Sequence, residues 1–391
     1  MRDLINQNII KINDYPFERL SALLKDTNPQ DKDIINLSIG QPNHKIPFFV
    51  EPIIKKYKAN WNLYPPLSGL DCLKKSYLKW IVRRFNSGRF LSSENILPLS
   101  GSREGLFSIS LILNIKKLIV PNPFYQAYLG SSVLGKMKIT YLDLKAENNY
   151  LYDLEKLENK ISKRPALIYF CTPSNPQGKC ASLSYLRKLI NLVRKNNSLI
   201  VIDECYTDIY YNTKPAGAVE ACEGLGKSMK NVIVSHTLSK RSNAAGIRSA
   251  FITADKDIIK ALKKFRSYSA PTIPIPLQYT SSALWNDDKH VAENRLEYKK
   301  KFDYADKLLS FYKHYKRPEA GFYIWLKVKN GEKTAIDLYK KYSLKVMPGS
   351  FLAKGLGNDN PGKNFVRLAL VPKFVVCKEA LLRVKKYLYE K

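Results

Sequence analysis

The sequence lacks long apolar runs and paired cysteines, and each absence excludes a class of protein. No stretch approaches the ~18 consecutive apolar residues that a membrane-spanning helix needs, so no membrane partner is expected. The cysteines are Cys72, Cys171, Cys180, Cys205, Cys222 and Cys377. They form no Cys-x-x-Cys pair and have no histidine at zinc-ligand spacing, so no metal site is expected. Unpaired thiols and the lack of an apolar signal-peptide core near the start predict a cytoplasmic protein.

Acidic residues are also scarce, since 34 Asp and Glu stand against 65 Lys and Arg, a net charge of +31. Such an excess is typical of nucleic-acid-binding proteins, whose affinity falls steeply with salt. Here the basic residues are scattered from end to end, and no DNA- or RNA-binding motif accompanies them. The charge is therefore interpreted as compositional drift that would attract anionic substrates, and no specific nucleic-acid partner is expected.

Short apolar runs alternate with amphipathic stretches through the middle of the chain. The runs cover residues 96–99, 118–120, 166–171, 198–203 and 232–234. The amphipathic stretches include residues 70–85 and 183–195, whose apolar spacing predicts helices. This alternation predicts an α/β fold with a mostly parallel sheet. No internal repeat interrupts it.

The last part of the chain has a different pattern. It predicts a long charged helix over 287–312, strands over 321–328 and 364–371, a turn at 346–351 and a closing helix over 378–389. Three parts are therefore expected: an N-terminal segment, 1–45, that joins a smaller α+β domain, a large domain, 46–285, and the small C-terminal domain, 286–391.

Polar side chains recur where the predicted strands end. They are Ser102, Tyr125, Asn175, Asp203, Tyr206 and Lys240. A structural role would explain any one of them. Because ligands of open α/β sheets bind at the carboxyl ends of the strands, their recurrence predicts one shared site.

The stretch from Ser235 to Arg248 has the densest chemistry. Its small hydroxyl residues, with Gly246 and Arg248, suit a phosphate group. Lys240 could attack a carbonyl if its amine were partly neutral, and the neighbouring Arg241 is expected to lower its pKa. A solvated basic loop is the alternative for this stretch taken alone.

These residues together resemble the class I aminotransferases, pyridoxal-phosphate enzymes of the aspartate-aminotransferase fold type. The matching stretches, in the family's order, are Gly40-Gln-Pro42, Gly101-Ser-Arg-Glu104, Asn175-Pro-Gln-Gly178, Asp203-Glu-Cys-Tyr206, Thr237-Leu-Ser-Lys240 and Arg367. The resemblance covers nearly the whole chain. It implies a fold-type-I transferase with pyridoxal 5′-phosphate as cofactor, amino-acid and keto-acid substrates and a homodimer.

The resemblance also implies a role for each matching residue. Lys240 would hold the cofactor as an imine and move the substrate proton, and Asp203 would pair with the ring nitrogen. Tyr206 and Asn175 would hydrogen-bond the ring oxygen, and Tyr125 would stack on the ring.

For the phosphate, the resemblance implies the amides of Ser102 and Arg103 with Thr237 and Arg248. Tyr64 would reach the same phosphate from a partner subunit. For the substrate α-carboxylate, it implies Arg367, with Asn175 and the backbone of Gly40 nearby.

A narrower resemblance is to the succinyldiaminopimelate transaminases of lysine biosynthesis. It rests on stretches such as Pro121-Asn-Pro-Phe-Tyr-Gln126, His290-Val-Ala-Glu-Asn-Arg295 and Pro348-Gly-Ser-Phe-Leu-Ala353. An aminotransferase for aspartate or aromatic amino acids, or a β-lyase on the same fold, stays open, because the substrate pocket is spread over loops. Gln177, Thr237 and Gly105 differ from the more usual Thr, Ser and Ala, without removing a reacting group.

Overall fold

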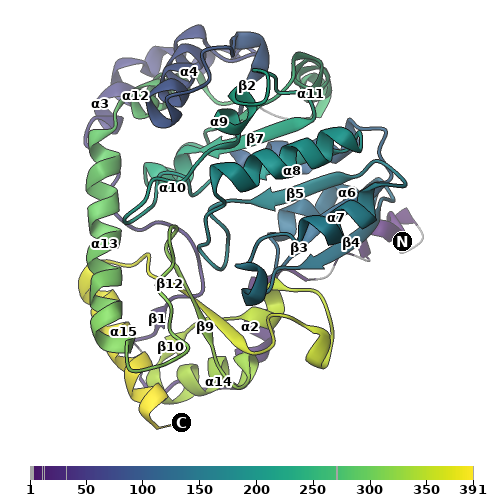
Figure 1. The fold of residues 1–391 in the computed structure, drawn as a ribbon. Helices are drawn as coiled ribbons and strands as arrows, with labels where there is room; N and C mark the ends of the chain where they lie inside the picture. The colour runs from purple at the N-terminus through teal and green to yellow at the C-terminus, as the bar shows by residue number, and fades with distance from the viewer. Residues whose placement is uncertain (1–3, 11, 13, 32, 270–271, 391) are drawn as a thin grey trace.

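A seven-stranded sheet lies at the centre of the larger part of the molecule (Figure 1). The computed structural model describes residues 4–10, 12, 14–31, 33–269 and 272–390. The strands are β2 (Ile96–Leu99), β3 (Lys117–Asn122), β4 (Lys138–Asp143), β5 (Leu167–Cys171), β6 (Leu199–Asp203), β7 (Val232–Thr237) and β8 (Ala250–Thr253). Their order is β2-β8-β7-β6-β5-β3-β4. Strand β8 runs antiparallel to both of its neighbours, and the other pairs are parallel, so the predicted mostly parallel sheet is confirmed.

Helices surround this sheet and continue into the smaller part. They are α1 (Gln7–Ile10), α2 (Pro16–Leu24), α3 (Val50–Lys56), α4 (Asp71–Phe85), α5 (Ser102–Ser108), α6 (Gly130–Leu134), α7 (Leu154–Ile161), α8 (Leu183–Lys195), α9 (Ala218–Glu223), α10 (Leu238–Arg241), α11 (Lys256–Ser269), α12 (Ile275–Asn286), α13 (Lys289–Leu309), α14 (Gly331–Tyr342) and α15 (Phe374–Tyr389). In the described part of the chain, none of them is both long and apolar enough to cross a bilayer.

The central strands are buried on both faces, which explains why their sequences are continuous apolar runs. Successive side chains of a strand point to opposite faces. Ile168 and Ile200 accordingly join one apolar cluster, with Trp80 of α4. Leu167 and Val201 join another on the opposite face. The sheet is thus sandwiched between two helical layers, as the fold class requires.

The smaller part combines both ends of the chain. Strands β9 (Tyr323–Lys327), β11 (Met347–Pro348) and β12 (Phe365–Ala369) form one sheet. Strand β1 (Ile35–Asn36) pairs with β10 (Leu344–Lys345) in another, so the N-terminal residues do join the C-terminal ones. A separate apolar cluster lies here, and it includes Leu37. The domain boundaries after residues 45 and 285 stay a prediction.

Helix α13 connects the two parts. Figure 1 shows it running along one side of the molecule, from α12 and α4 at one end to α15 at the other. The loops at the carboxyl ends of β5, β6 and β7 face the smaller part, and the strand-end residues meet residues of β9 and β12 there.

Candidate active site

Every predicted site residue except Tyr64 lines a single cavity of about 460 Å³. They are Gly40, Ser102, Arg103, Tyr125, Asn175, Asp203, Tyr206, Thr237, Lys240, Arg248 and Arg367. The cavity lies where the carboxyl ends of the parallel strands meet the smaller part, which is the usual place for a ligand in such folds. Their sequence positions are far apart, so this gathering is a result of the topology.

Lys240 lies in α10, which follows directly from β7. The side chain of Thr237 caps this helix by accepting a hydrogen bond from the Ser239 amide at 3.2 Å. The Lys240 amine donates to the Gly40 carbonyl at 2.7 Å. Burial lowers the pKa of Lys240 to about 8; Cys205 and Asp203 oppose this shift, and the guanidinium groups of Arg367 and Arg248 add to it. A substantial neutral fraction near pH 8 suits an amine that must accept protons.

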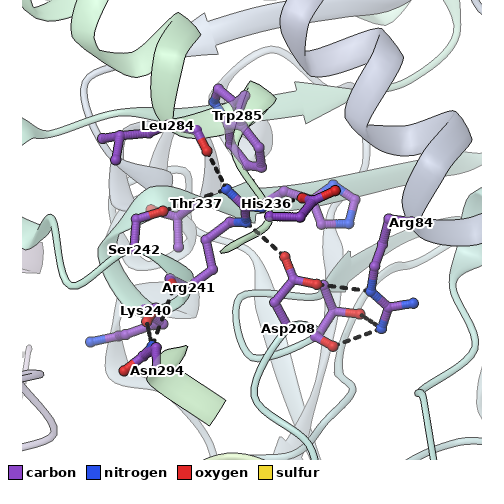
Figure 2. A network of polar contacts seen from close by, with 12 residues as sticks. Arg84, Asp208, His236, Thr237, Lys240, Arg241, Ser242, Leu284, Trp285 and Asn294 are labelled. Atoms are coloured by element: carbon purple, nitrogen blue, oxygen red, sulfur yellow. Dashed lines mark hydrogen bonds and ion pairs between the residues drawn. The ribbon is translucent and has the colours of Figure 1, made fainter. Parts of the chain in front are cut away.

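Arg241 is not among the main causes of this shift, so its predicted effect on the pKa of Lys240 is not supported. Its guanidinium points away from the cavity, because adjacent residues of a helix face different directions. It donates to Asp208 at 2.7 Å and to the Leu284 carbonyl at 2.6 Å (Figure 2). The cations that act on Lys240 come from elsewhere in the fold.

Asp203 is a buried carboxylate at the end of β6. It accepts hydrogen bonds from the Tyr128 hydroxyl at 2.8 Å and from the Cys205 amide at 3.2 Å. Burial raises the pKa of Asp203, although these hydrogen bonds oppose the rise. No described cation lies within ion-pair distance of it. A carboxylate held by neutral donors alone is suited to bind a cationic group of a ligand.

A cup of donors lies beside these two residues. Gly101 has a φ of +87°, and a Cβ on it would lie 1.9 Å from Arg248 Nη2, so glycine is required there. Ser102 begins α5 next to it. Glu104 braces the turn by accepting from the Ser100 amide at 2.6 Å. Hydroxyls, amides and a guanidinium are the groups that bind a phosphate.

Arg367 forms the opposite wall. It is 4 % exposed and donates to Asn175 Oδ1 at 3.0 Å and to the Ser38 carbonyl at 2.8 Å. Its guanidinium lies over the ring of Tyr323, 4.4 Å from the centroid. No described carboxylate pairs with Arg367, so its charge is available to a substrate carboxylate.

Arg103 lies at the open end of the cavity, with its side chain exposed. Its Nε donates to the Tyr125 hydroxyl at 3.1 Å, and its Nη2 lies 3.5 Å from the hydroxyl of Tyr15, just before α2. The side chain therefore turns toward the N-terminal segment, although its amide lies in the phosphate turn. Besides Arg248 in the donor cup, the cavity thus has guanidinium groups at two further positions, Arg103 and Arg367.

Comparisons with known proteins agree with this geometry. The family model for aminotransferase class I and II matches residues 32–375. The chain belongs to this family. An aminotransferase from Neisseria meningitidis is 34 % identical, with a TM-score of 0.92 over 98 % of this chain and 100 % of that one. The aminotransferase AspB from Helicobacter pylori is 33 % identical, with a TM-score of 0.89 over 97 % of this chain and 99 % of the other.

Among curated proteins, an LL-diaminopimelate aminotransferase from Dehalococcoides mccartyi is 28 % identical over 94 % of each chain. The transaminase BacF from Bacillus subtilis is 26 % identical, over 95 % of this chain and 93 % of BacF. Class I and II aminotransferases use pyridoxal 5′-phosphate. The residues of this aminotransferase fit that cofactor, because the uncompensated Asp203 matches a protonated ring nitrogen and the donor cup matches a phosphate.

Sequence reasoning missed several residues that line the cavity of this aminotransferase. They are Tyr15, Phe17, Gln41, Tyr128, Ser239 and Tyr323. Tyr128 follows Tyr125 by one helical turn, and that spacing could have indicated a shared face. Tyr15 and Tyr323 have no local signal, since α2 and β9 reach the cavity only in the tertiary structure.

Tyr64 is the one predicted residue outside the cavity, and its side chain is 100 % exposed. A role for it in the site of the same chain is therefore not supported. Its predicted role in a partner's site stays a prediction.

Proposed function

We propose that this aminotransferase transfers an amino group between glutamate or 2-oxoglutarate and N-succinyl-2-amino-6-oxopimelate, in the biosynthesis of diaminopimelate and lysine. The observation that carries the proposal is the pair of guanidinium groups that the cavity has outside the phosphate cup, Arg367 on the buried wall and Arg103 at the open end. The substrate has an α-carboxylate at the reacting end and two further carboxylates at the other. Arg367 would bind the first, and Arg103 would bind a distal one.

Free LL-diaminopimelate is the second candidate, because relatives of 27–28 % identity are named as its aminotransferases. It carries an ammonium group at the distal end. The charged residues that line the cavity are Arg103, Arg248, Arg367 and Lys240 against Asp203 alone. An ammonium group is disfavoured beside Arg103, whereas a succinyl group replaces it with an amide and adds a carboxylate. The charge of the cavity therefore favours the succinylated compound.

When bound, pyridoxal phosphate supplies a carbonyl that accepts the amino group and a ring that withdraws electrons from the substrate Cα. Asp203 would keep the ring nitrogen protonated, and Tyr206 and Asn175 would donate to the ring oxygen. Thr237, Arg248 and the backbone of Ser102 would hold the phosphate.

Lys240 would remove the proton from the substrate Cα and deliver it to C4′ of the cofactor. Its lowered pKa supports this role, because a base works best near the pH at which it operates. Arg367 and the Gly40 carbonyl would orient the substrate beside the amine, since the amine already donates to that carbonyl at 2.7 Å.

We also propose a homodimer in which Tyr64 completes the partner's phosphate site. Large apolar side chains near Tyr64 are exposed, among them Phe48, Trp61 and Leu63, at 90 %, 52 % and 53 %. Several large apolar side chains exposed within one segment of the chain favour an interface there. Mixing Tyr64→Ala and Lys240→Ala chains should restore activity, because one of the two sites in a mixed dimer is intact. Full activity in a monomer would contradict the proposal.

Labelling tests the cofactor site. Borohydride reduction followed by peptide mapping should place the pyridoxyl group on Lys240, and Lys240→Ala should not turn over. A label on another lysine would contradict the assignment.

A substrate panel tests the specificity. Succinylated diaminopimelate, free diaminopimelate, aspartate and an aromatic amino acid are compared as amino donors to 2-oxoglutarate, and the first should have the highest kcat/KM. Arg103→Gln should lower that kcat/KM by about 10- to 100-fold, the effect of one charged hydrogen bond, and should affect aspartate less. Arg164→Gln, on an exposed position after α7, is the matched control. A tenfold preference for aspartate, about 1.4 kcal/mol, would exclude the succinylated substrate and leave the aminotransferase activity intact.

A further inference from the structure

A buried lysine lies outside the cavity without an acidic partner. Lys301, in the middle of α13, is 0 % exposed. Its Nζ lies 2.6 Å from His44 Nε2, 3.0 Å from the Leu370 carbonyl and 3.4 Å from the Val371 carbonyl. No carboxylate among the described residues is within ion-pair distance of it. A buried ammonium that is bound only by neutral acceptors is rare, because its desolvation is costly.

The three acceptors around Lys301 determine which ring nitrogen of His44 carries the proton. An ammonium group has three N–H donors, and each finds one acceptor here. Burial lowers the pKa of Lys301 to about 8, although Cys377 of α15 and Glu297 of α13 oppose the shift, so the ammonium predominates at neutral pH. His44 must then accept at Nε2 and carry its proton on Nδ1.

The hydrogen bonds continue from His44 to the active-site helix. His44 Nδ1 lies 2.7 Å from Asn294 Oδ1. The amide nitrogen of Asn294 donates to the Arg241 carbonyl at 3.2 Å and to the Lys240 carbonyl at 3.4 Å (Figure 2). Lys301, His44 and Asn294 thus form a directed chain that ends on the backbone of Lys240.

The other end of the chain lies beside the substrate-binding strand. Leu370 and Val371 follow β12 directly, and β12 carries Arg367. His44 lies in the loop that begins at Gly40, whose carbonyl accepts from the Lys240 amine. The chain therefore joins three separate segments that meet in the cavity.

An aromatic layer connects the same segments. The ring of His44 packs on Tyr298 at 4.5 Å, and Tyr298 stacks on Phe322 at 5.4 Å. The Lys240 amine lies 5.7 Å from the centroid of Phe322. Polar and apolar contacts thus both run from His44 to Lys240.

We propose that Lys301, His44 and Asn294 are positioning residues that hold the Lys240 helix and the Gly40 loop in register with the strand of Arg367. Their effect is on the proton transfer by Lys240, because the amine must reach the substrate Cα with correct geometry. The inference rests on the role of Lys240 proposed above, and goes beyond it by assigning a function to residues that do not contact the cavity.

Two substitutions of His44 separate hydrogen bonding from packing. His44→Gln keeps an acceptor for Lys301 and a donor for Asn294 but loses the ring, whereas His44→Phe keeps the ring and loses both hydrogen bonds. Both variants are measured as cofactor-loaded enzyme with any amino donor that the wild type accepts. His44→Phe should lower kcat by about 10- to 100-fold and change KM less than threefold. His44→Gln should keep kcat within about threefold of the wild type. The midpoint of the pH titration of the cofactor's visible absorbance should move in Phe and stay in Gln.

The proposal would be overturned by a larger loss of kcat in His44→Gln than in His44→Phe, by equal losses in both variants, or by a wild-type kcat in both. Borohydride labelling of Lys240 in the same preparations separates this failure from a failure of the proposed cofactor site. If Lys240 is labelled but His44→Gln loses at least as much kcat as His44→Phe, only the positioning role of Lys301, His44 and Asn294 is refuted.

Lys301→Met gives a second measurement that does not depend on a destabilised fold. Replacing the Lys301 ammonium by an apolar side chain of similar length removes a desolvated charge but leaves three buried acceptors without their donor, so the two effects on stability oppose each other. The melting temperature should therefore change little, while kcat falls by about tenfold or more. Lys307→Met, on an exposed position of the same helix, should change neither. A wild-type kcat in Lys301→Met, or a loss of kcat only in step with the melting temperature, would overturn the proposal.

Discussion

Asp203 and Asp208 lie close together in the chain and are equally buried, at 4 % exposure each, yet their surroundings are opposite. Asp208 pairs with Arg84 at 2.8 Å and with Arg241 at 2.7 Å (Figure 2). Asp203 accepts hydrogen bonds from a hydroxyl and an amide only.

The pKa values reflect this difference. Burial raises the pKa of Asp203. Burial would also raise that of Asp208, but Arg241 and Arg84 hold the pKa of Asp208 down to about 2. A carboxylate whose charge is balanced within the fold serves the fold, whereas an unbalanced one needs a cation from a ligand. The contrast distinguishes a structural from a functional acid without reference to any relative.

The largest effect is expected for Asp203→Asn. Activity should fall by about 10²- to 10⁴-fold, because a neutral amide no longer compensates a cationic ring, and breaking a buried ion pair costs about 3–5 kcal/mol. Steady-state kinetics with saturating cofactor measure the loss, and circular dichroism checks the fold. Turnover near the wild-type level would remove Asp203 from the mechanism.

Asp208→Asn should act on stability instead. It leaves the buried guanidinium of Arg84 without a counter-charge and Arg241 with only the more exposed Asp288 at 3.2 Å, so the free energy of unfolding should fall by about 3–5 kcal/mol. Urea denaturation followed by fluorescence measures this. If the variant is as stable as the wild type but inactive, Asp208 acts in the reaction rather than in the fold, and the contrast with Asp203 is wrong.

The two acids should also differ in the pH dependence of stability. The folded pKa of Asp208 is below its ordinary 3.8, so its contribution of about 2–3 kcal/mol is present above pH 4 and is lost as pH falls toward 2. The folded pKa of Asp203 is raised, so without cofactor its contribution is lost as pH rises above 4.

Unfolding of cofactor-free protein between pH 3 and pH 7 measures both contributions. The advantage of wild type over Asp208→Asn should shrink toward low pH. Asp203→Asn should be more stable than wild type at pH 7 and lose that advantage below pH 4. A parallel pH dependence of the two variants would contradict these assignments.

Arg241→Lys is expected to have the smallest effect. A lysine keeps the charge but cannot reproduce the fork that bonds Asp208 and the Leu284 carbonyl, so unfolding should become easier by about 1–3 kcal/mol. The pH dependence of kcat should stay unchanged, because Arg241 is not among the main causes of the lowered pKa of Lys240. A shift of the alkaline limb of the kcat–pH profile in Arg241→Lys would show that Arg241 does lower the pKa of Lys240.

Local patterns were enough for much of the fold. The apolar spacing of residues 183–195 predicted α8 with the observed bounds, and Ser182 caps its first turn. The closing helix begins at Phe374, earlier than predicted, because Val375 and Val376 favour strands locally and are helical only in the folded chain. The turn at 346–351 contains β11, since Met347 pairs with Arg367 far along the chain.

One departure from the family pattern also has a tertiary reason. A Cβ on Gly105 would lie 2.6 Å from Leu99 Cδ1 and 2.8 Å from Ile252 Cγ1, so the packing of α5 on the sheet leaves no room for alanine. No local rule indicates this, because Ile252 comes from β8.

The sequence by itself determined the chemistry available at the strand ends, because strand periods, turn residues and reactive side chains are properties of neighbouring residues. Asp203, Lys240 and Arg367 could be named from it. The tertiary structure alone decided which charges are balanced: Asp208 meets Arg84 and Arg241, Lys301 meets His44, and Asp203 meets no described cation. Charge compensation depends on distances of a few ångströms between residues remote in sequence, and only packing sets those distances.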